Sequence, residues 1–373
     1  MFLVSLGAAV SFASSRDMSS CESKARKVCV GEAITLRDLI EVDPKVLVSN
    51  TSRLAKDEGF AREVQMIWKA EIREFPHGQD HAFLKSTPLI YYCDEVDEGH
   101  YDSINDDVAE FLKMPLYGNL IQNPANAQES KVPGIVLFHT GAGPNDIFMR
   151  WKADALISSL PYNCSVLIAD LVSDSDGESW DPKKYGPKRK VMMGKILKGK
   201  DGIWRRTILQ QRIKAAIKAL KGIHNVDPQR IGAMGWCLGG RAVSELARMN
   251  LNGVRCAVSF HGVVDNGGLD EAQLEENRET IAAQGQRINE LEVLLCNGAE
   301  DPFVSNDDLE ACRNSLALVG VKTTLVNYEN TLHGFTNPAQ DLNPSPSFGY
   351  NEKAAKSSWE EGIKLFRQSL KGK

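Results

Sequence analysis

The chain has 373 residues, of which 42% are hydrophobic and 25% charged, and 44 basic residues against 49 acidic ones give a net charge of −5. This composition excludes collagen-like, coiled-coil and fully disordered chains. The acidic balance argues against a nucleic-acid surface driven by bulk charge, and no apolar run reaches the roughly 18 residues of a membrane span. At roughly 150 residues per domain the length allows two domains, although one α/β domain can fill most of it.

Residues 1–80 form an N-terminal extension to which the sequence attaches no chemistry. Residues 1–15 begin with the apolar stretch MFLVSLGAAVSFA, which ends in small residues of the kind that precede a signal-peptide cleavage site. The first basic residue, Arg16, comes after that stretch, whereas a secretory signal carries its positive charge before it. We therefore favour a cytoplasmic protein, with secretory or organelle targeting by residues 1–15 as the alternative.

The eight cysteines are scattered, without a C-x-x-C pair or a Cys/His pair at zinc spacing. In a chain of this size such cysteines are expected to be mostly reduced and buried. The spacing predicts no metal site.

Residues 81–373 are predicted to form one α/β domain. Residues 87–117 predict a β-hairpin with a loose acidic loop, and residues 119–131 a connection into the core. From Val132 onward, short apolar runs alternate with longer helical patterns, which is typical of a mainly parallel, doubly wound sheet covered by helices on both faces. The expected strands are residues 134–140, 165–171, 230–236, 254–260, 291–297 and 322–328.

The clearest helical pattern covers residues 205–221, whose apolar residues fall on one face. The opposite face is basic, and we expect it to be solvated, as in other surface helices. Its residues are Arg206, Arg212, Lys214, Lys218 and Lys221.

The strongest signal for function is the segment GWCLGG at residues 235–240, which lies between an expected strand and a helical stretch. It matches the G-x-nucleophile-x-G elbow, with Cys237 where serine is more usual. The turn is so tight that side chains at the flanking positions would clash, which explains the glycines. Cys237 would then lie at a helix N-terminus that favours its thiolate, and the backbone N–H of Leu238 would face a developing oxyanion.

A nucleophile of this kind needs a base, and the base needs an acid that orients it. In elbow enzymes the acid and then the histidine follow on loops after later strands. The segment GAEDPF follows one expected strand and supplies Asp301, with Glu300 as the competing acid. The segment LHGF follows the next expected strand and supplies His333. The ordered triple is the specific signal, because each residue alone would be weak.

Two other histidines follow expected strands. His261 is assigned a structural or pocket-lining role, because the acid–base position is already filled. His139 precedes a glycine-rich loop in which Thr140 or Gly141 is expected to supply the second oxyanion N–H. Trp236 and Phe335 complete the candidate pocket residues.

These motifs together resemble the dienelactone hydrolase family of α/β-hydrolases, over roughly Val132 to the C-terminus. The resemblance rests on GWCLGG around Cys237, GAEDPFV around Asp301, HGFTNP from His333, and the C-terminal segment GYNEKA leading to Ser358 and Trp359. It implies an α/β-hydrolase fold and a Cys–His–Asp triad that attacks a lactone or ester carbonyl through a thiol ester, without a cofactor.

Two departures from the family pattern bear on the substrate. Dienelactone-cleaving members usually carry a glutamate at the end of the first core strand, where this chain has Thr140, and an arginine shortly after the catalytic histidine, where it has Asn337. The basic residues 183–190 could clamp an anionic substrate or form a solvated loop. The polar segment 269–292 resembles a surface insertion that shapes the site mouth or contacts a partner.

The sequence therefore predicts a hydrolase that cleaves a small ester or lactone, with no nucleic-acid partner and no membrane span. Two alternatives stay open: a relic of the fold that binds a ligand or partner without turnover, and a thioesterase or acyl transferase on the same triad. The sequence does not predict the substrate or the oligomeric state.

Overall fold

The computed structural model describes residues 84–94, 112–123, 131–172, 207–268 and 290–372, apart from residues 145 and 344, together with scattered residues and two short strands near the N-terminus. These strands are β1 (Cys29–Val30) and β2 (Ile34–Thr35), and both pair antiparallel with β3 (Lys85–Tyr91). The rest of the extension at residues 1–80, including the candidate targeting segment, lies outside the described residues.

The chain divides into two compact units. The first comprises Met1–Ala127, Ala142–Asp154 and Leu167–Leu220. The second comprises Gln128–Gly141, Ala155–Val166 and Lys221–Lys373. Two elements, β6 (Ser165–Ala169) and α5 (Ile147–Ser159), have residues in both units.

The first unit contains the predicted hairpin, formed by β3 and β4 (Leu116–Gln122) in antiparallel register. The second strand begins later than the sequence predicts and continues through residues 119–122, which we had assigned to the connection. Its buried residues include Leu116, Gly118 and Leu120, which alternate along one face as a half-buried strand requires. The polar residues between them made this segment resemble a connection in the sequence.

Asp170, directly after β6, connects the strands of the first unit. Its buried carboxylate accepts a hydrogen bond from the backbone N–H of Tyr117 at 2.8 Å, and its own N–H donates to the Tyr91 hydroxyl at 2.9 Å. The helix α7 (Thr207–Lys221) matches the predicted amphipathic segment. The prediction that Arg212 is solvated is wrong: its side chain is fully buried and donates to the carbonyl of Leu171 at 2.8 Å.

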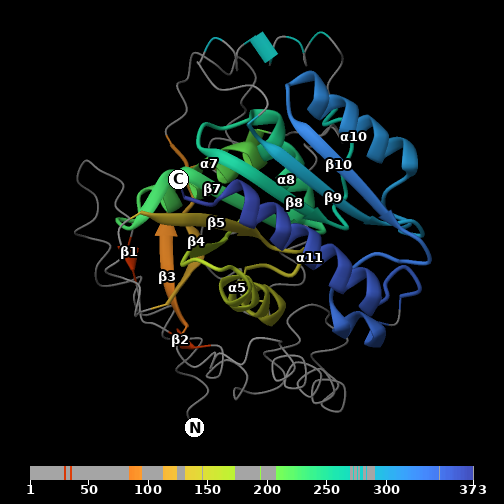
Figure 1. The fold of residues 1–373 in the computed structure, drawn as a ribbon, viewed down its shortest axis with the longest axis horizontal. Coiled ribbons are helices and arrows are strands. Elements are labelled where there is room, and N and C mark those ends of the chain that lie inside the picture. Colours follow the sequence, from red (N-terminus) through yellow and green to blue (C-terminus); the bar gives the residue numbers. More distant parts are fainter. Residues whose placement is uncertain are drawn as a thin grey trace. The chain divides into compact units, whose positions relative to one another are not determined.

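The second unit is built on five parallel strands in the order β5, β7, β8, β9, β10. The helices α8 (Leu238–Met249) and α10 (Asn306–Leu318) pack on one face, and α11 (Glu352–Ser369) crosses the other (Figure 1). This arrangement confirms the predicted parallel sheet with helices on both faces. The strands are β5 (Val132–Phe138), β7 (Val226–Trp236), β8 (Val254–Phe260), β9 (Glu292–Gly298) and β10 (Lys322–Tyr328).

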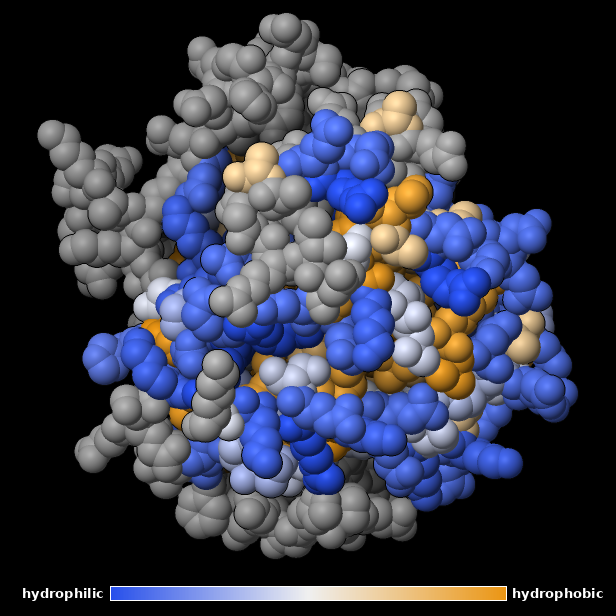
Figure 2. Space-filling view, turned by 45° about the horizontal axis from the view of Figure 1, so that its top comes forward, coloured by the Kyte–Doolittle hydropathy of each residue, from blue (hydrophilic) through white to orange (hydrophobic). Residues whose placement is uncertain are grey.

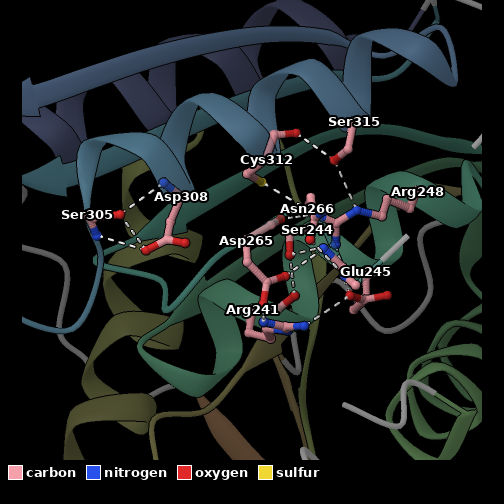
Figure 3. Close-up of polar contacts among 12 residues, drawn as sticks. Arg241, Ser244, Glu245, Arg248, Asp265, Asn266, Ser305, Asp308, Cys312 and Ser315 are labelled. Atoms are coloured by element: carbon pink, nitrogen blue, oxygen red, sulfur yellow. Dashed lines mark hydrogen bonds and ion pairs between the residues drawn. The ribbon is translucent and has the colours of Figure 1, made fainter. Parts of the chain in front are cut away.

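The helix α8 is buried along nearly its whole length, and its charged residues are buried with it. Glu245 binds Arg248 at 2.8 Å and lies 3.7 Å from Arg241, whose guanidinium also contacts Asp265 at 2.5 Å (Figure 3). Arg248 reaches the neighbouring helix α10 through a 3.2 Å hydrogen bond to Ser315. These contacts compensate the buried charges and fix the helix that begins directly after Cys237.

The helix α10 begins with a capping box that is also drawn in Figure 3. The Ser305 hydroxyl accepts from the N–H of Asp308 at 3.1 Å, and the Asp308 carboxylate accepts from the N–H of Ser305 at 3.1 Å. The cap satisfies two otherwise unpaired donors of the first turn. It thereby fixes the end of the short loop between β9 and α10.

Most described residues on the face drawn in Figure 2 are hydrophilic, with apolar residues visible between them. Within the described part of the chain, no helix is long and apolar enough to cross a membrane.

The buried network on α8 can be tested by its effect on stability. Glu245→Gln leaves Arg241 and Arg248 buried without their shared carboxylate, and we expect a loss of about 3–5 kcal/mol in the free energy of unfolding. Glu310→Gln is the matched control, because Glu310 pairs with Arg313 on the surface, where such pairs contribute about 0–1 kcal/mol. Equal shifts in the urea midpoints of the two variants would contradict this account.

Candidate active site

Cys237 occupies the one-residue turn between β7 and α8, as the motif predicts. Its φ of 55° and ψ of −112° are rare for a residue with a side chain. A Cβ on Gly235 would lie 2.0 Å from the carbonyl oxygen of Gly239, and a Cβ on Gly239 would lie 1.9 Å from that of Phe138. The two glycines therefore allow the close backbone approach that directs the Cys237 side chain out of the turn.

Cys237 is partly exposed as a residue, but its thiol is buried and receives hydrogen bonds from the backbone N–H groups of Leu238 and Gly141. Gly141 is one of the two candidate donors that the sequence left open. The carbonyl of the neighbouring Thr140 accepts a hydrogen bond from Nδ1 of His139 at 2.5 Å. His139 is fully buried, and its hydrogen bond helps to fix the conformation of the loop.

His333 lies between the other two predicted residues. Its side chain is hydrogen-bonded to Cys237, and its Nδ1 lies 2.6 Å from Oδ2 of Asp301. Asp301 is buried whereas Glu300 is exposed, so Asp301 is the carboxylate that orients the ring. The second oxygen of Asp301 accepts from the backbone N–H of Phe303 at 2.9 Å, which fixes the carboxylate.

Opposing effects set the pKa of the Cys237 thiol. Burial raises it, but the charge of His333 and the hydrogen bonds from His333, Gly141 and Leu238 more than compensate, so the pKa is lowered. Burial likewise opposes the charge on His333, yet the thiolate of Cys237 and the hydrogen bond to Asp301 raise its pKa to about 10. The two shifts belong to one coupled pair, and they favour a thiolate beside an imidazolium.

The other thiols of the described residues lack this environment. Cys164 is the clearest contrast, since burial raises its pKa to about 12. Burial also raises the pKa of Cys256, Cys296 and Cys312.

The remaining predicted pocket residues are buried. Trp236 is stacked on Phe260 with ring centroids 5.1 Å apart. His261 packs edge-on against His333 at 5.1 Å, and its Nε2 lies 2.9 Å from the hydroxyl oxygen of Thr336. Phe335 packs in turn against His261 at 5.4 Å. His261 thus contacts the candidate base directly and Phe335 contacts it through His261, whereas Trp236 packs against Phe260.

Two residues beside His333 were not predicted. The rings of Phe303 and Phe348 lie 4.9 and 5.2 Å from the imidazole. Phe303 belongs to the GAEDPFV motif, so its place next to Asp301 was a usable signal. Phe348 comes from a later loop, and no sequence motif connects it to the histidine.

The two departures from the family pattern have clear structural counterparts. The carbonyl of Thr140 accepts the hydrogen bond from His139. The Asn337 side chain caps the short helix η8 (Pro338–Leu342) by accepting a hydrogen bond from the N–H of Ala339. The basic residues 183–190 and most of the insertion 269–292 lie outside the described residues. In the described part of the chain, no group of three His, Cys, Asp or Glu residues is arranged to hold a metal ion.

The parallel sheet, the strand–turn–helix elbow and the loops after β9 and β10 define the class of protein, an α/β-hydrolase. The sequence model of the dienelactone hydrolase family matches residues 118–370. The chain therefore belongs to the dienelactone hydrolase family.

Solved structures agree with this fold. The structure of m3DLH is 25% identical, with a TM-score of 0.54, and the match covers 78% of this chain and all of that one (100%). The dienelactone hydrolase-like promiscuous phosphotriesterase P91 from metagenomic libraries is 23% identical, with a TM-score of 0.52, over 69% of this chain and 93% of that one. The uncharacterized protein K02A2.1 of Caenorhabditis elegans is 26% identical over 163 residues, which are 43% of this chain and 94% of that protein.

The coupled pair predicts how the thiol reacts with iodoacetamide as the pH changes. Because the pKa of Cys237 is lowered, we expect its alkylation rate to rise at a pH below the ordinary thiol pKa of about 8.5. His333→Ala removes the charge and a hydrogen bond but leaves the burial. The rise should therefore move to higher pH, and alkylation at pH 6 should slow by about tenfold or more. Cys237→Ala is the control and should lack the fast-reacting thiol; an unchanged profile in His333→Ala would contradict the pairing.

Proposed function

We propose that this protein is a cysteine hydrolase that cleaves a small ester or lactone through a thiol ester intermediate, without a cofactor. Cys237 is the nucleophile, His333 the proton carrier and Asp301 the residue that orients the imidazole. The backbone N–H groups of Leu238 and Gly141 form the oxyanion hole.

The observation that carries this proposal is that two loops and the start of α8 converge on one sulfur atom. Two N–H groups and one imidazole are hydrogen-bonded to Cys237, and the imidazole is held on its other side by a buried carboxylate. Donors next to the nucleophile are suited to stabilise the negative oxygen of a tetrahedral intermediate. The same donors and the imidazolium keep the sulfur ionised in the resting enzyme.

The reaction then has two halves. In the first, Sγ attacks the carbonyl carbon, the bond from that carbon to the alcohol oxygen breaks, and the alcohol leaves with the Nε2 proton of His333. In the second, His333 takes a proton from water, the resulting hydroxide attacks the thiol ester, and the carbon–sulfur bond breaks. The carboxylic acid departs and the thiolate–imidazolium pair is restored.

The departures at Thr140 and Asn337 indicate the kind of substrate. The Asn337 amide cannot pair with a carboxylate by charge as an arginine does, and it is already used to cap η8. Thr140 offers no carboxylate to compete for the histidine or to control the thiol. We therefore favour an uncharged ester or lactone over a dienelactone that carries a carboxylate.

The proposal is tested by turnover of p-nitrophenyl acetate and a small lactone such as dihydrocoumarin. Cys237→Ala should lower kcat/KM by about 10³-fold or more, because the covalent route is lost. The matched control is Cys164→Ala, which removes a buried thiol of raised pKa and should leave turnover within about twofold if the variant folds.

Circular dichroism shows whether each variant is folded. Activity retained by a folded Cys237→Ala would rule out the cysteine mechanism. A wild-type protein that turns over none of these substrates would favour a binding relic of the fold. Faster turnover of acyl thioesters than of oxygen esters would favour the thioesterase alternative.

A further inference from the structure

Among the described residues, Phe303 is the large hydrophobic side chain that stands out for its exposure, with 47% of its surface accessible. Burying a phenylalanine side chain normally stabilises a protein, because it removes apolar surface from water. Single exposed apolar residues are common, but this one lies in direct contact with the candidate active site.

The ring of Phe303 is fixed relative to the reacting groups. Its backbone N–H donates to Asp301 at 2.9 Å, and its ring lies 4.9 Å from that of His333 at an interplanar angle of 71°. Phe348 supports it from the side, with centroids 5.5 Å apart. The exposed surface of Phe303 is therefore held next to the imidazole.

Phe348 is fixed by the backbone as well as by its ring. The N–H of His333 donates to the carbonyl of Ser347 at 3.2 Å, and the N–H of Gly349 donates to the carbonyl of His333 at 3.2 Å. The Phe348 ring lies 5.2 Å from the imidazole at 83°. Two aromatic rings from two loops thus flank one histidine.

Shielding of the imidazole explains only part of this arrangement. With both rings in place His333 is 2% exposed, and it also packs against His261. The inner side of Phe303 contributes to that shielding. Its outer side remains exposed.

The proposed mechanism indicates which part of a substrate lies beside His333. His333 gives its Nε2 proton to the departing alcohol oxygen, so the alcohol portion must lie beside the imidazole. The aromatic rings next to it offer an apolar surface with no charge. From the contacts of these rings we infer that Phe303 and Phe348 bind an aromatic or extended alkyl alcohol portion of the ester. This inference rests on the proposed function and adds the substrate class.

The placement of the rings beside the leaving alcohol predicts an effect on acylation and none on deacylation. Acetate esters of different alcohols pass through the same acetyl-enzyme once the alcohol has left. The aromatic rings should therefore act on kcat/KM, which includes acylation, and not on the hydrolysis of the acetyl-enzyme.

The test compares the hydrolysis of ethyl acetate with that of 2-phenylethyl acetate, and both reactions are measured by the release of acetate. Phe303→Ala should lower kcat/KM for 2-phenylethyl acetate roughly tenfold more than it lowers kcat/KM for ethyl acetate. Since each ester is compared between variant and wild type, the intrinsic reactivities cancel. Phe303→Tyr keeps the ring and should retain the preference, and Phe348→Leu should lower it by a smaller factor.

A merely structural role would appear differently. If Phe303 only positions His333, Phe303→Ala should slow both esters equally and shift the pH dependence of Cys237 alkylation, and this result would overturn the inference. Wild-type turnover of both esters with an unchanged ratio in Phe303→Ala would also overturn it, while leaving the proposed function intact. Failure of the wild type to cleave either ester would remove the proposed function and the inference together.

Discussion

The ionisation of the Cys237 thiol depends on two opposing effects: burial raises its pKa and the charge of His333 lowers it. Burial by itself makes a thiol harder to ionise, as the raised pKa of Cys164 shows. At Cys237 the imidazolium and two backbone N–H groups reverse that effect. The imidazolium in turn depends on Asp301 and on the thiolate itself. The thiolate and the imidazolium thus stabilise each other's charge in a buried environment, and the imidazolium also depends on its hydrogen bond to Asp301.

The scaffold serves this pair by fixing backbone positions. Parallel strands bring the Cys237 turn and the loops that carry Asp301 and His333 to the same edge of the sheet. Close backbone approach at Gly235 and Gly239 sets the turn at Cys237. Glu245 pairs with Arg241 and Arg248 inside α8. These two arginines in turn connect the helix to Asp265 and to Ser315 of α10. Burial of several charges in one helix costs desolvation free energy, and the network offsets that cost only while it is complete.

The sequence predicted those features that depend on local spacing. The elbow, the ordered triple and the parallel strands follow from glycine positions and apolar runs. Asp301 is preferred over Glu300 from its place in the motif, and its carboxylate lies 2.6 Å from Nδ1 of His333. Spacing alone does not choose between Thr140 and Gly141, because that depends on how the loop turns. Arg212 was wrongly predicted to be solvated. Helical periodicity shows on which face a residue lies, but it does not show that a buried carbonyl, that of Leu171, accepts a hydrogen bond from the guanidinium.

The most direct measurement is capture of the covalent intermediate. A bulky activated ester such as p-nitrophenyl pivalate should deacylate slowly, so that acid quench and peptide mass spectrometry find the acyl group on the protein. The account predicts one acyl group on Cys237, removed by neutral hydroxylamine as a thiol ester is, and little adduct in His333→Ala. A hydroxylamine-resistant adduct on another residue, or rapid ester cleavage with no adduct at Cys237, would contradict it.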